Sequence, residues 1–331
     1  MCSCNPAATA ESPRPLYGGQ AVIEGVMIRG VRHYSLAVRR PDGGIFCSTE
    51  PVSSRLSGPM RHVPFLRGVL ILAETLWLGM KSLQRSAIIA AEEPDADQSG
   101  DSDAGQSSVS NWTMGITMAI ALVLGIGIFL VLPLLAARLM EPFVASLLVI
   151  NLIEGVIRLV VLVGYVAGIS LMKDIRRVYA YHGAEHMAVH TYEAGEPLTV
   201  DNVRRHPTPH PRCGTAFLIT VAIVSVAAFA ILDALLGTEL YWRILSRIVP
   251  VPLVAAISYE IIRFAGAHRG SWFGKILSAP GLWLQRITTR QPDADQIEVA
   301  IAAMTAAVAA DANADAPPNP APCGTVTPAS G

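Results

Sequence analysis

The apolar run Thr215–Leu236, with the sequence TAFLITVAIVSVAAFAILDALL, decides the class of fold. Its only charged residue is Asp233, and the run is long enough to cross the roughly 30 Å hydrocarbon layer of a bilayer. Comparable runs occupy Trp112–Leu135, Leu147–Met172 and Ile244–Phe264. The sequence therefore predicts an α-helical integral membrane protein with about four transmembrane helices. Arg247 and two prolines lie inside the last run, so that helix is expected to be kinked or to start late.

The overall composition agrees with a membrane protein. Of the 331 residues, 52% are hydrophobic and only 15% are charged, where soluble domains carry about 25% charged residues. The mean hydropathy is +0.43, which argues against an ordinary cytosolic enzyme. The 25 Lys and Arg residues are balanced by 26 acidic residues, so no basic footprint for nucleic acid is present.

The basic residues near the apolar runs predict the orientation. Six Lys and Arg residues lie in the connector between the second and third runs, whereas the connector between the first two has one, Arg138. Cytosolic loops carry the excess of basic residues, so the longer connector and both termini are expected in the cytosol. The five cysteines are scattered, as expected for reduced thiols facing the cytosol, and no signal peptide precedes the runs.

The segment 16–91 is expected to form a small cytosolic α/β unit with an amphipathic helix. Residues His33–Cys47 contain two apolar stretches separated by a Pro-Asp-Gly-Gly turn, a pattern typical of a β-hairpin. Helical periodicity follows in Pro64–Ile89, but charged residues interrupt it. This helix is therefore expected to lie on the membrane or to pack against the cytosolic unit.

The remaining segments read as linkers and surface elements. Residues 92–110 are acidic and predict a flexible linker, and residues 1–15 a disordered tail. Ser271–Thr289, within the interfacial segment 265–290, mixes tryptophan with basic residues, as helices in the headgroup layer do. The stretch 291–331 is rich in Ala and Pro and predicts a mostly disordered tail.

The connector 173–214 concentrates the residues that could carry chemistry. It holds five of the eight histidines, and Tyr181–His186 spells H-x-x-E-H after its tyrosine. On a helix, His182 and His186 would share a face, in the order in which some metalloproteases hold zinc. Downstream, His210 and Cys213 form an H-x-x-C pair that could complete a site for Zn²⁺ or another divalent metal.

Two kinds of metal site remain open. If His182, His186, His210 and Cys213 all bind, the shell is closed and structural; if one does not, a position remains for water and catalysis. Glu185 is either a general base or a residue that orients an imidazole. A Cys213 nucleophile with His210 as its base is less favoured, because no acid or oxyanion motif accompanies the pair.

The other ionisable residues have simpler interpretations. His190 and His206 are expected to be solvated histidines. Inside the second run, Glu154 and Arg158 have ion-pair spacing and share a polar stripe with Asn151, which indicates either a structural pair or a polar path. Three further charged residues lie close enough to the ends of their runs to reach the interface: Asp233, Glu260 and Arg263.

Three motifs in this order resemble the YqhQ-like family of bacterial membrane proteins: Tyr17–Gly30, Tyr181–His186 and His210–Thr215. The resemblance extends from Leu16 to Arg290. It implies a multi-pass protein of the bacterial inner membrane whose His/Glu/Cys cluster is a metal site, but it implies no particular reaction.

The leading hypothesis is a metal-dependent membrane enzyme, hydrolytic in character, with a cytosol-facing site. The alternative is a non-catalytic scaffold or adaptor whose connector is held by a structural zinc, with a cytosolic protein partner bound by the N-terminal unit. A transporter built on Glu154 and Arg158 is less favoured, because the four runs show no repeat. The lipid bilayer is the one partner that each of these hypotheses requires.

Overall fold

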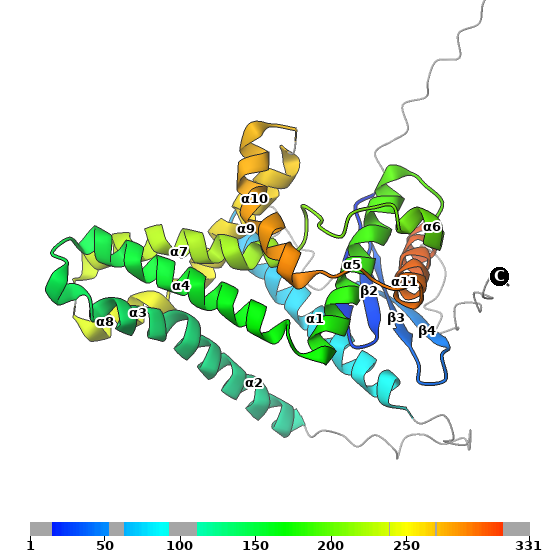
Figure 1. Ribbon diagram of the computed structural model, residues 1–331, viewed down its shortest axis with the longest axis horizontal. Helices are drawn as coiled ribbons and strands as arrows, with labels where there is room; N and C mark the ends of the chain where they lie inside the picture. The colour runs from blue at the N-terminus through cyan, green and yellow to red at the C-terminus, as the bar shows by residue number, and fades with distance from the viewer. Residues whose placement is uncertain (1–14, 53–62, 93–110, 238, 269, 314–331) are drawn as a thin grey trace, which may run out of the picture.

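Figure 1 shows a computed structural model in which an elongated helical bundle meets a lobe built around a small sheet. The structure describes residues 15–52, 63–92 and 111–313, except for residues 238 and 269. The predicted tail at 1–15 and linker at 92–110 therefore lie almost wholly outside the described residues.

The sheet is an antiparallel meander of four strands in chain order: β1 (Gly18–Val22), β2 (Gly25–Arg29), β3 (His33–Arg39) and β4 (Ile45–Pro51). The predicted hairpin is confirmed, because Arg39 pairs with Ile45 and Ala37 with Cys47. Its turn closes through a bond from the Arg40 amide to the Gly44 carbonyl, and Gly43 supplies a φ of 85°.

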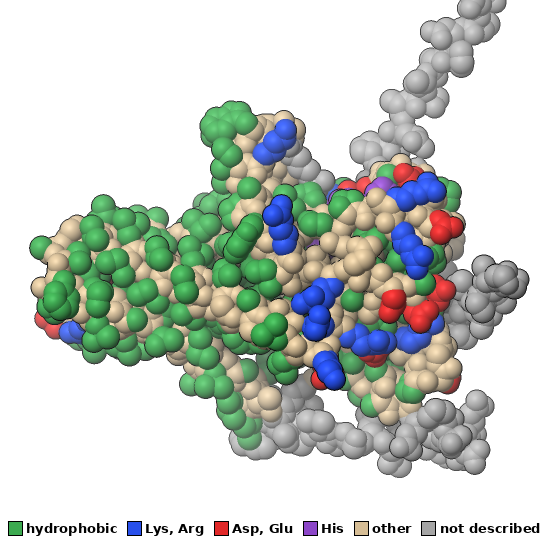
Figure 2. Space-filling model, in the orientation of Figure 1, with side chains coloured by type: hydrophobic (Ala, Val, Ile, Leu, Met, Phe, Trp, Pro, Cys, Tyr) green, Lys and Arg blue, Asp and Glu red, His purple; other side chains and the backbone are tan. Residues whose placement is uncertain are grey.

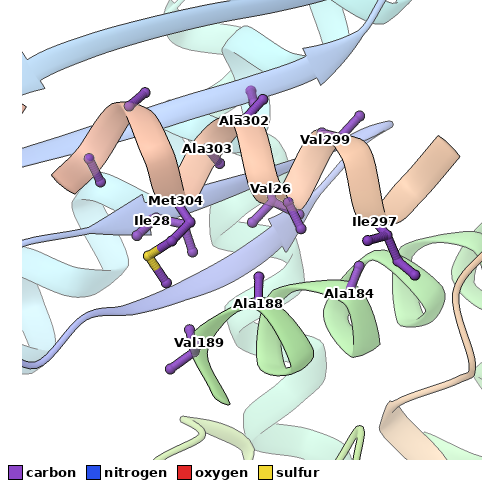
Figure 3. Packing of buried hydrophobic residues seen from close by; sticks show 14 of the residues in the cluster. Val26, Ile28, Ala184, Ala188, Val189, Ile297, Val299, Ala302, Ala303 and Met304 are labelled. Atoms are coloured by element: carbon purple, nitrogen blue, oxygen red, sulfur yellow. The ribbon is translucent and has the colours of Figure 1, made fainter. Parts of the chain in front are cut away.

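One face of the sheet is covered by two helices from distant parts of the chain, α5 (Lys173–Ala194) and α11 (Ala294–Ala312), with the short α6 (Val200–Val203) beside them. Figure 3 shows both helices presenting small and apolar side chains to Val26 and Ile28. The hydroxyl of Ser35 donates to the carbonyl of Ala303 over 2.6 Å. The expected N-terminal unit is thus completed by later segments.

The predicted disordered tail at 291–331 is wrong for Ala294–Ala312. A capping box formed by Asp293 and Gln296 starts the helix, and its alanines allow a close approach to the strands. Burial of this apolar face stabilises the helix, which composition alone did not indicate. Residues 314–331 lie outside the described part.

The opposite face of the sheet packs against α1 (Leu66–Ala91), where Ile89 joins a core with β2 and β3. Lys81 and Arg85 both bond to Glu50 of β4. At its other end, Arg67 of α1 forms a bidentate ion pair with Glu260 of α9 (Val251–Ala267). Of the two expected placements, the structure therefore has α1 packed on the sheet, and it joins the sheet lobe to the bundle.

The bundle contains the long apolar helices. Their bounds, with a π-helical turn η3 and a 3₁₀ turn η4, are α2 (Asn111–Ile126), η3 (Gly127–Val131), α3 (Leu132–Arg138), η4 (Glu141–Phe143), α4 (Leu147–Ile169), α7 (Thr215–Leu236), α8 (Leu240–Ile248), α9 and α10 (Trp272–Thr288). Within the described ranges, Gly115–Phe143, α4 and α7 are long and apolar enough to cross a membrane. The α8 and α9 pair, bent by 45°, makes a fourth candidate span, which matches the expected kink near Pro250.

Several apolar helices of this kind suggest a membrane protein. On the face that Figure 2 shows, hydrophobic side chains are spread over the whole bundle, and most of the charged side chains gather on the sheet lobe. Exposed apolar residues on α2 and α4 include Leu122, Val123, Val156 and Val160, each more than half exposed. In water such a continuous apolar surface would be unfavourable.

A buried ion network lies inside the bundle. The predicted pair is present, with Arg158 Nη2 2.5 Å from Glu154 Oε1. Arg247 of α8 bonds to the same glutamate over 2.6 Å and also to Asp233 of α7. Asp233 was expected to reach the interface, and that expectation is wrong: it is 2% exposed because two arginines of α8, Arg243 and Arg247, fold back onto it.

The π-helical turn η3 contributes a hydrogen-bond acceptor to this network. A π-helical turn leaves a carbonyl of the helix available, and the carbonyl of Phe129 accepts a bond of 3.1 Å from Arg158 Nε. The guanidinium groups of Arg158 and Arg247 both contact the ring of Phe229, at 4.8 and 5.0 Å from its centroid. The charges are thus shared among four segments of the bundle.

Candidate metal centre

Helix α5 carries the H-x-x-E-H motif on the side that meets the bundle. One helical turn separates His182 from His186, and their ring centroids are 4.3 Å apart. The helix ends at Gly195, which adopts the left-handed conformation with φ 78° and satisfies the last carbonyls. The connector then returns toward α5 before α7 begins.

The returning connector brings Cys213 to the two histidines. Its Sγ lies 3.1 Å from His182 Nε2, and one ligand atom from each of His182, His186 and Cys213 falls within 4.8 Å of the others. The edges of a tetrahedral zinc site with nitrogen and sulfur ligands are about 3.5 Å long. The amide of Thr215 donates to the sulfur over 3.4 Å.

The second nitrogen of each ligand histidine is fixed by a backbone carbonyl. His182 Nδ1 lies 2.8 Å from the Thr288 carbonyl oxygen, and His186 Nδ1 lies 2.5 Å from that of Thr208. A carbonyl can only accept, so both Nδ1 atoms donate, and in the neutral form of each ring the lone pair is on Nε2. This is the tautomer that metal-ligating histidines adopt.

Glu185 lies beside the ligand atoms without joining them. Its Oε2 is 3.5 Å from His186 Nε2, and it accepts a bond from the Gly19 amide of β1. Burial raises the pKa of Glu185 and lowers the pKa of His186. The His186 shift favours the neutral imidazole that binds metals, and a bound cation would lower the raised pKa of the carboxyl group again.

A small cavity of about 30 Å³ adjoins these side chains, which is room for one or two water molecules. Its lining includes Glu185, His186 and Cys213 together with Gly18 and Gly19 of β1. A Cβ on Gly19 would lie 2.2 Å from the Met27 carbonyl oxygen and 3.2 Å from Glu185 Cγ. The glycine therefore permits the close approach of β1 to the site, a role that sequence reasoning missed.

His210 lies near the group but not in it. Its Nδ1 accepts a bond from the Arg212 amide over 3.2 Å, and its Nε2 faces Glu193 at 3.6 Å. Gln285 of α10 holds its backbone on both sides, accepting from the His210 amide and donating to its carbonyl. Of the predicted H-x-x-C pair, Cys213 therefore belongs to the candidate ligand group and His210 lies beside it.

His190 and His206 extend the row of imidazoles away from the site. The His190 ring is 4.5 Å from that of His210 and 6.1 Å from that of His206. Neither of these two residues is fully solvated as expected, because the carbonyl of Pro209 contacts His190 and Glu196 contacts His206. Burial lowers the pKa of His190 to about 4, so it is neutral at physiological pH.

Three residues that support the site carried no local signal in the sequence: Thr208, Gln285 and Thr288. They act through backbone carbonyls or through contacts with residues far away in the chain. The folded chain brings Gln285 and Thr288 there on α10, and Thr208 on the connector that precedes α7.

The comparisons agree with the resemblance expected from the motifs. The family model described as a protein of unknown function, DUF1385, matches residues 63–310. The "Uncharacterized protein YqhQ" of Bacillus subtilis (strain 168) is 34% identical over 293 residues, which cover 87% of this chain and 90% of that protein. No solved structure matches the chain. A family model over most of the chain and a relative at this identity lead to one conclusion: the chain belongs to the DUF1385 family, the YqhQ-like proteins of unknown function.

Proposed function

We propose that this protein is a metal-dependent hydrolase of the bacterial cytoplasmic membrane. One observation carries the proposal: the ligand atoms of His182, His186 and Cys213 converge beside a cavity that also holds the Glu185 side chain. Three protein ligands with an adjoining water-sized space are typical of catalytic rather than structural zinc sites.

The residues fit a divalent ion of borderline softness. Two imidazoles and one thiolate suit Zn²⁺, and the carbonyls of Thr208 and Thr288 orient both rings. A cation bound here would polarise an acyl or phosphoryl oxygen and make water a stronger acid. Glu185 lies where its carboxylate can take the proton from an attacking water and pass it to a leaving group.

The candidate site has three converging ligand atoms rather than four, which favours the enzyme over a scaffold held by a structural zinc. A closed shell would require His210 as a fourth ligand, but its Nδ1 accepts a backbone amide and its Nε2 faces Glu193. The apolar bundle surface supports the membrane placement. The basic connector supports a cytosolic position for the sheet lobe and both termini, because cytosolic loops carry the excess of basic residues.

The test measures metal content and coordination in purified protein. We expect about one divalent ion per chain, lost in the double variant His182→Ala with His186→Ala. In the Co²⁺ form, a thiolate-to-metal absorption band should be present and should vanish in Cys213→Ser. Glu185→Gln is the matched control, because it should keep both the metal and the band.

Added azide discriminates the enzyme from the scaffold. An open position should bind azide and change the Co²⁺ spectrum, whereas four protein ligands would leave the spectrum unchanged. Metal content that survives the double histidine variant, or a spectrum insensitive to azide, would contradict the proposed function.

A further inference from the structure

The first half of α10 is an exposed apolar surface. Trp272 and Phe273 are more than half exposed and stack with a centroid distance of 3.6 Å. Ile276 and Leu277 continue this surface on the next turn. In Figure 1 the turn between α9 and α10 projects sideways from the long axis of α4 and α7, and Figure 2 shows hydrophobic and basic side chains on it.

The charge of this region has one sign. Between residues 261 and 292 the sequence contains five Lys and Arg residues and no Asp or Glu. Arg263, Lys275 and Arg286 are exposed. Aromatic and basic residues together are typical of helices that lie at the headgroups of anionic lipids.

The last turn of α10 forms the hydrogen bonds that orient the candidate metal ligands. The Thr288 carbonyl accepts from His182, and Gln285 holds the backbone of His210, three residues before Cys213. The hydroxyl of Thr289 bonds to that of Thr208, whose carbonyl orients His186. Both ligand histidines are therefore oriented through this one helical turn.

The middle of α10 contains a proline and packs against α7. Pro280 lies inside the helix, where it removes one backbone hydrogen bond and favours a kink. At Gly281, a Cβ would come within 2.4 Å of the Ala216 Cβ, so this position rests directly on α7. A shift of the first half about this contact would move the last turn.

We propose that α10 couples the charge of the bilayer surface to the affinity of the metal centre. This inference rests on the proposed function, because it requires both the membrane and the metal. Its first half binds anionic headgroups, and its last turn then holds Thr288 and Gln285 in the positions that orient the ligands. Loss of an orienting contact to a ligand histidine lowers metal affinity about 10- to 100-fold.

The bilayer, rather than a protein, is the occupant that the surface favours. The exposed face of α10 is continuous with the apolar bundle through Phe264 of α9, which is about half exposed. A cytosolic protein would have to displace lipid from this edge, whereas an anionic bilayer supplies both apolar contact and complementary charge.

The experiment measures the Kd for Co²⁺ with the full-length protein in nanodiscs of two compositions. One contains phosphatidylcholine alone, and the other contains phosphatidylcholine mixed with phosphatidylglycerol. We expect the parent to bind Co²⁺ at least roughly fivefold more tightly in the anionic discs. Lys275→Glu, which reverses the exposed charge in the first half of α10 and leaves its last turn unchanged, should remove most of that difference.

The matched control is Arg204→Glu, which makes the same charge change at an exposed residue of the connector. It should keep the lipid dependence of the parent. Equal Co²⁺ affinity in both discs would overturn the coupling while leaving the metal centre intact. If the α10 variant keeps the difference in Co²⁺ affinity between the two discs, the lipid effect does not act through α10, and the coupling is overturned. If Co²⁺ does not bind in either kind of disc, both the proposed function and the coupling are contradicted.

Discussion

Gly183 shows why the H-x-x-E-H motif of this chain has glycine after its first histidine. The chain that leaves α10 crosses α5 at this residue, and a Cβ here would lie 2.1 Å from the Arg290 carbonyl oxygen. The crossing is held by a bond from the Arg290 amide to the Tyr179 carbonyl. The glycine therefore permits the contact that places Thr288 over His182.

Gly183→Ala should lower the melting temperature and weaken Co²⁺ binding, because the crossing segment has to move away from His182. The expected cost is about 1–3 kcal/mol of unfolding free energy. Gly164→Ala in α4 is the control, since nothing lies within 4 Å of its Cβ position. Alanine there should be neutral or stabilising by up to about 1 kcal/mol. Equal melting temperatures for the two variants would contradict this account.

The candidate ligands were partly predictable from single residues. His182 and His186 stand four residues apart, a spacing that a helix converts directly into proximity, whereas Cys213 comes 27 residues after His186 and is brought back by the connector. His210 stands three residues before Cys213, yet its Nδ1 accepts from the Arg212 amide and its Nε2 lies 3.6 Å from a Glu193 oxygen. Spacing predicts which residues lie near one another but not which ring nitrogen is available.

Helix α8 (Leu240–Ile248) carries the arginines that hold the bundle together. Three arginines and three carboxylates make up the network, and Asp233 connects Arg243 to Arg247. Removing one partner of a buried pair leaves an uncompensated charge, which costs more than the pair itself contributes. The network therefore fixes α8 against α4 and α7.

Asp233→Asn should lower the stability of the purified protein by roughly 3 kcal/mol or more, measured by thermal unfolding in detergent. Glu141→Gln is the control at the edge of the same network, where the carboxylate is 37% exposed, and it should cost no more than about 1 kcal/mol. Adding Arg243→Gln to Asp233→Asn should recover part of the loss, because it restores the charge balance. A double variant as unstable as the sum of its single variants would argue against a shared network.

The apolar elements followed from composition and the polar contacts between them did not. The runs around α4 and α7 were evident because their length matches a bilayer. The fold-back of α8 onto Asp233 depends on residues that are distant in the chain, and helix α11 was obscured by an Ala-rich composition shared with disordered tails. In α11 the capping residues Asp293 and Gln296 were the available signal.

The whole molecule divides its charges along its long axis. The bundle surface is apolar, and the charged side chains gather on the sheet lobe, where the candidate metal centre meets the ends of α7 and α10 (Figures 1 and 2). A site at this junction would be reached by substrates at the headgroup level. The orientation of the molecule then decides which side of the membrane supplies them.

Labelling with a membrane-impermeant maleimide should establish that orientation. In intact cells, Phe143→Cys at the far end of the bundle, where Phe143 is 82% exposed, should be labelled. Asp201→Cys on the sheet lobe should react only after the cells are opened, because the basic connector is expected in the cytosol. Labelling of Asp201→Cys alone in intact cells would reverse the topology.

The bond between Ser35 and Ala303 joins residues 268 positions apart, and this has a consequence for synthesis on the ribosome. At about 5–20 residues per second, the first strands wait roughly 15–50 s before α11 is made. During that interval the earlier helices can pack, but the part of the sheet face that α11 covers stays open. A chain that stops early therefore carries its long apolar helices without a finished lobe, and the uncovered part of the sheet marks it for proteases and chaperones.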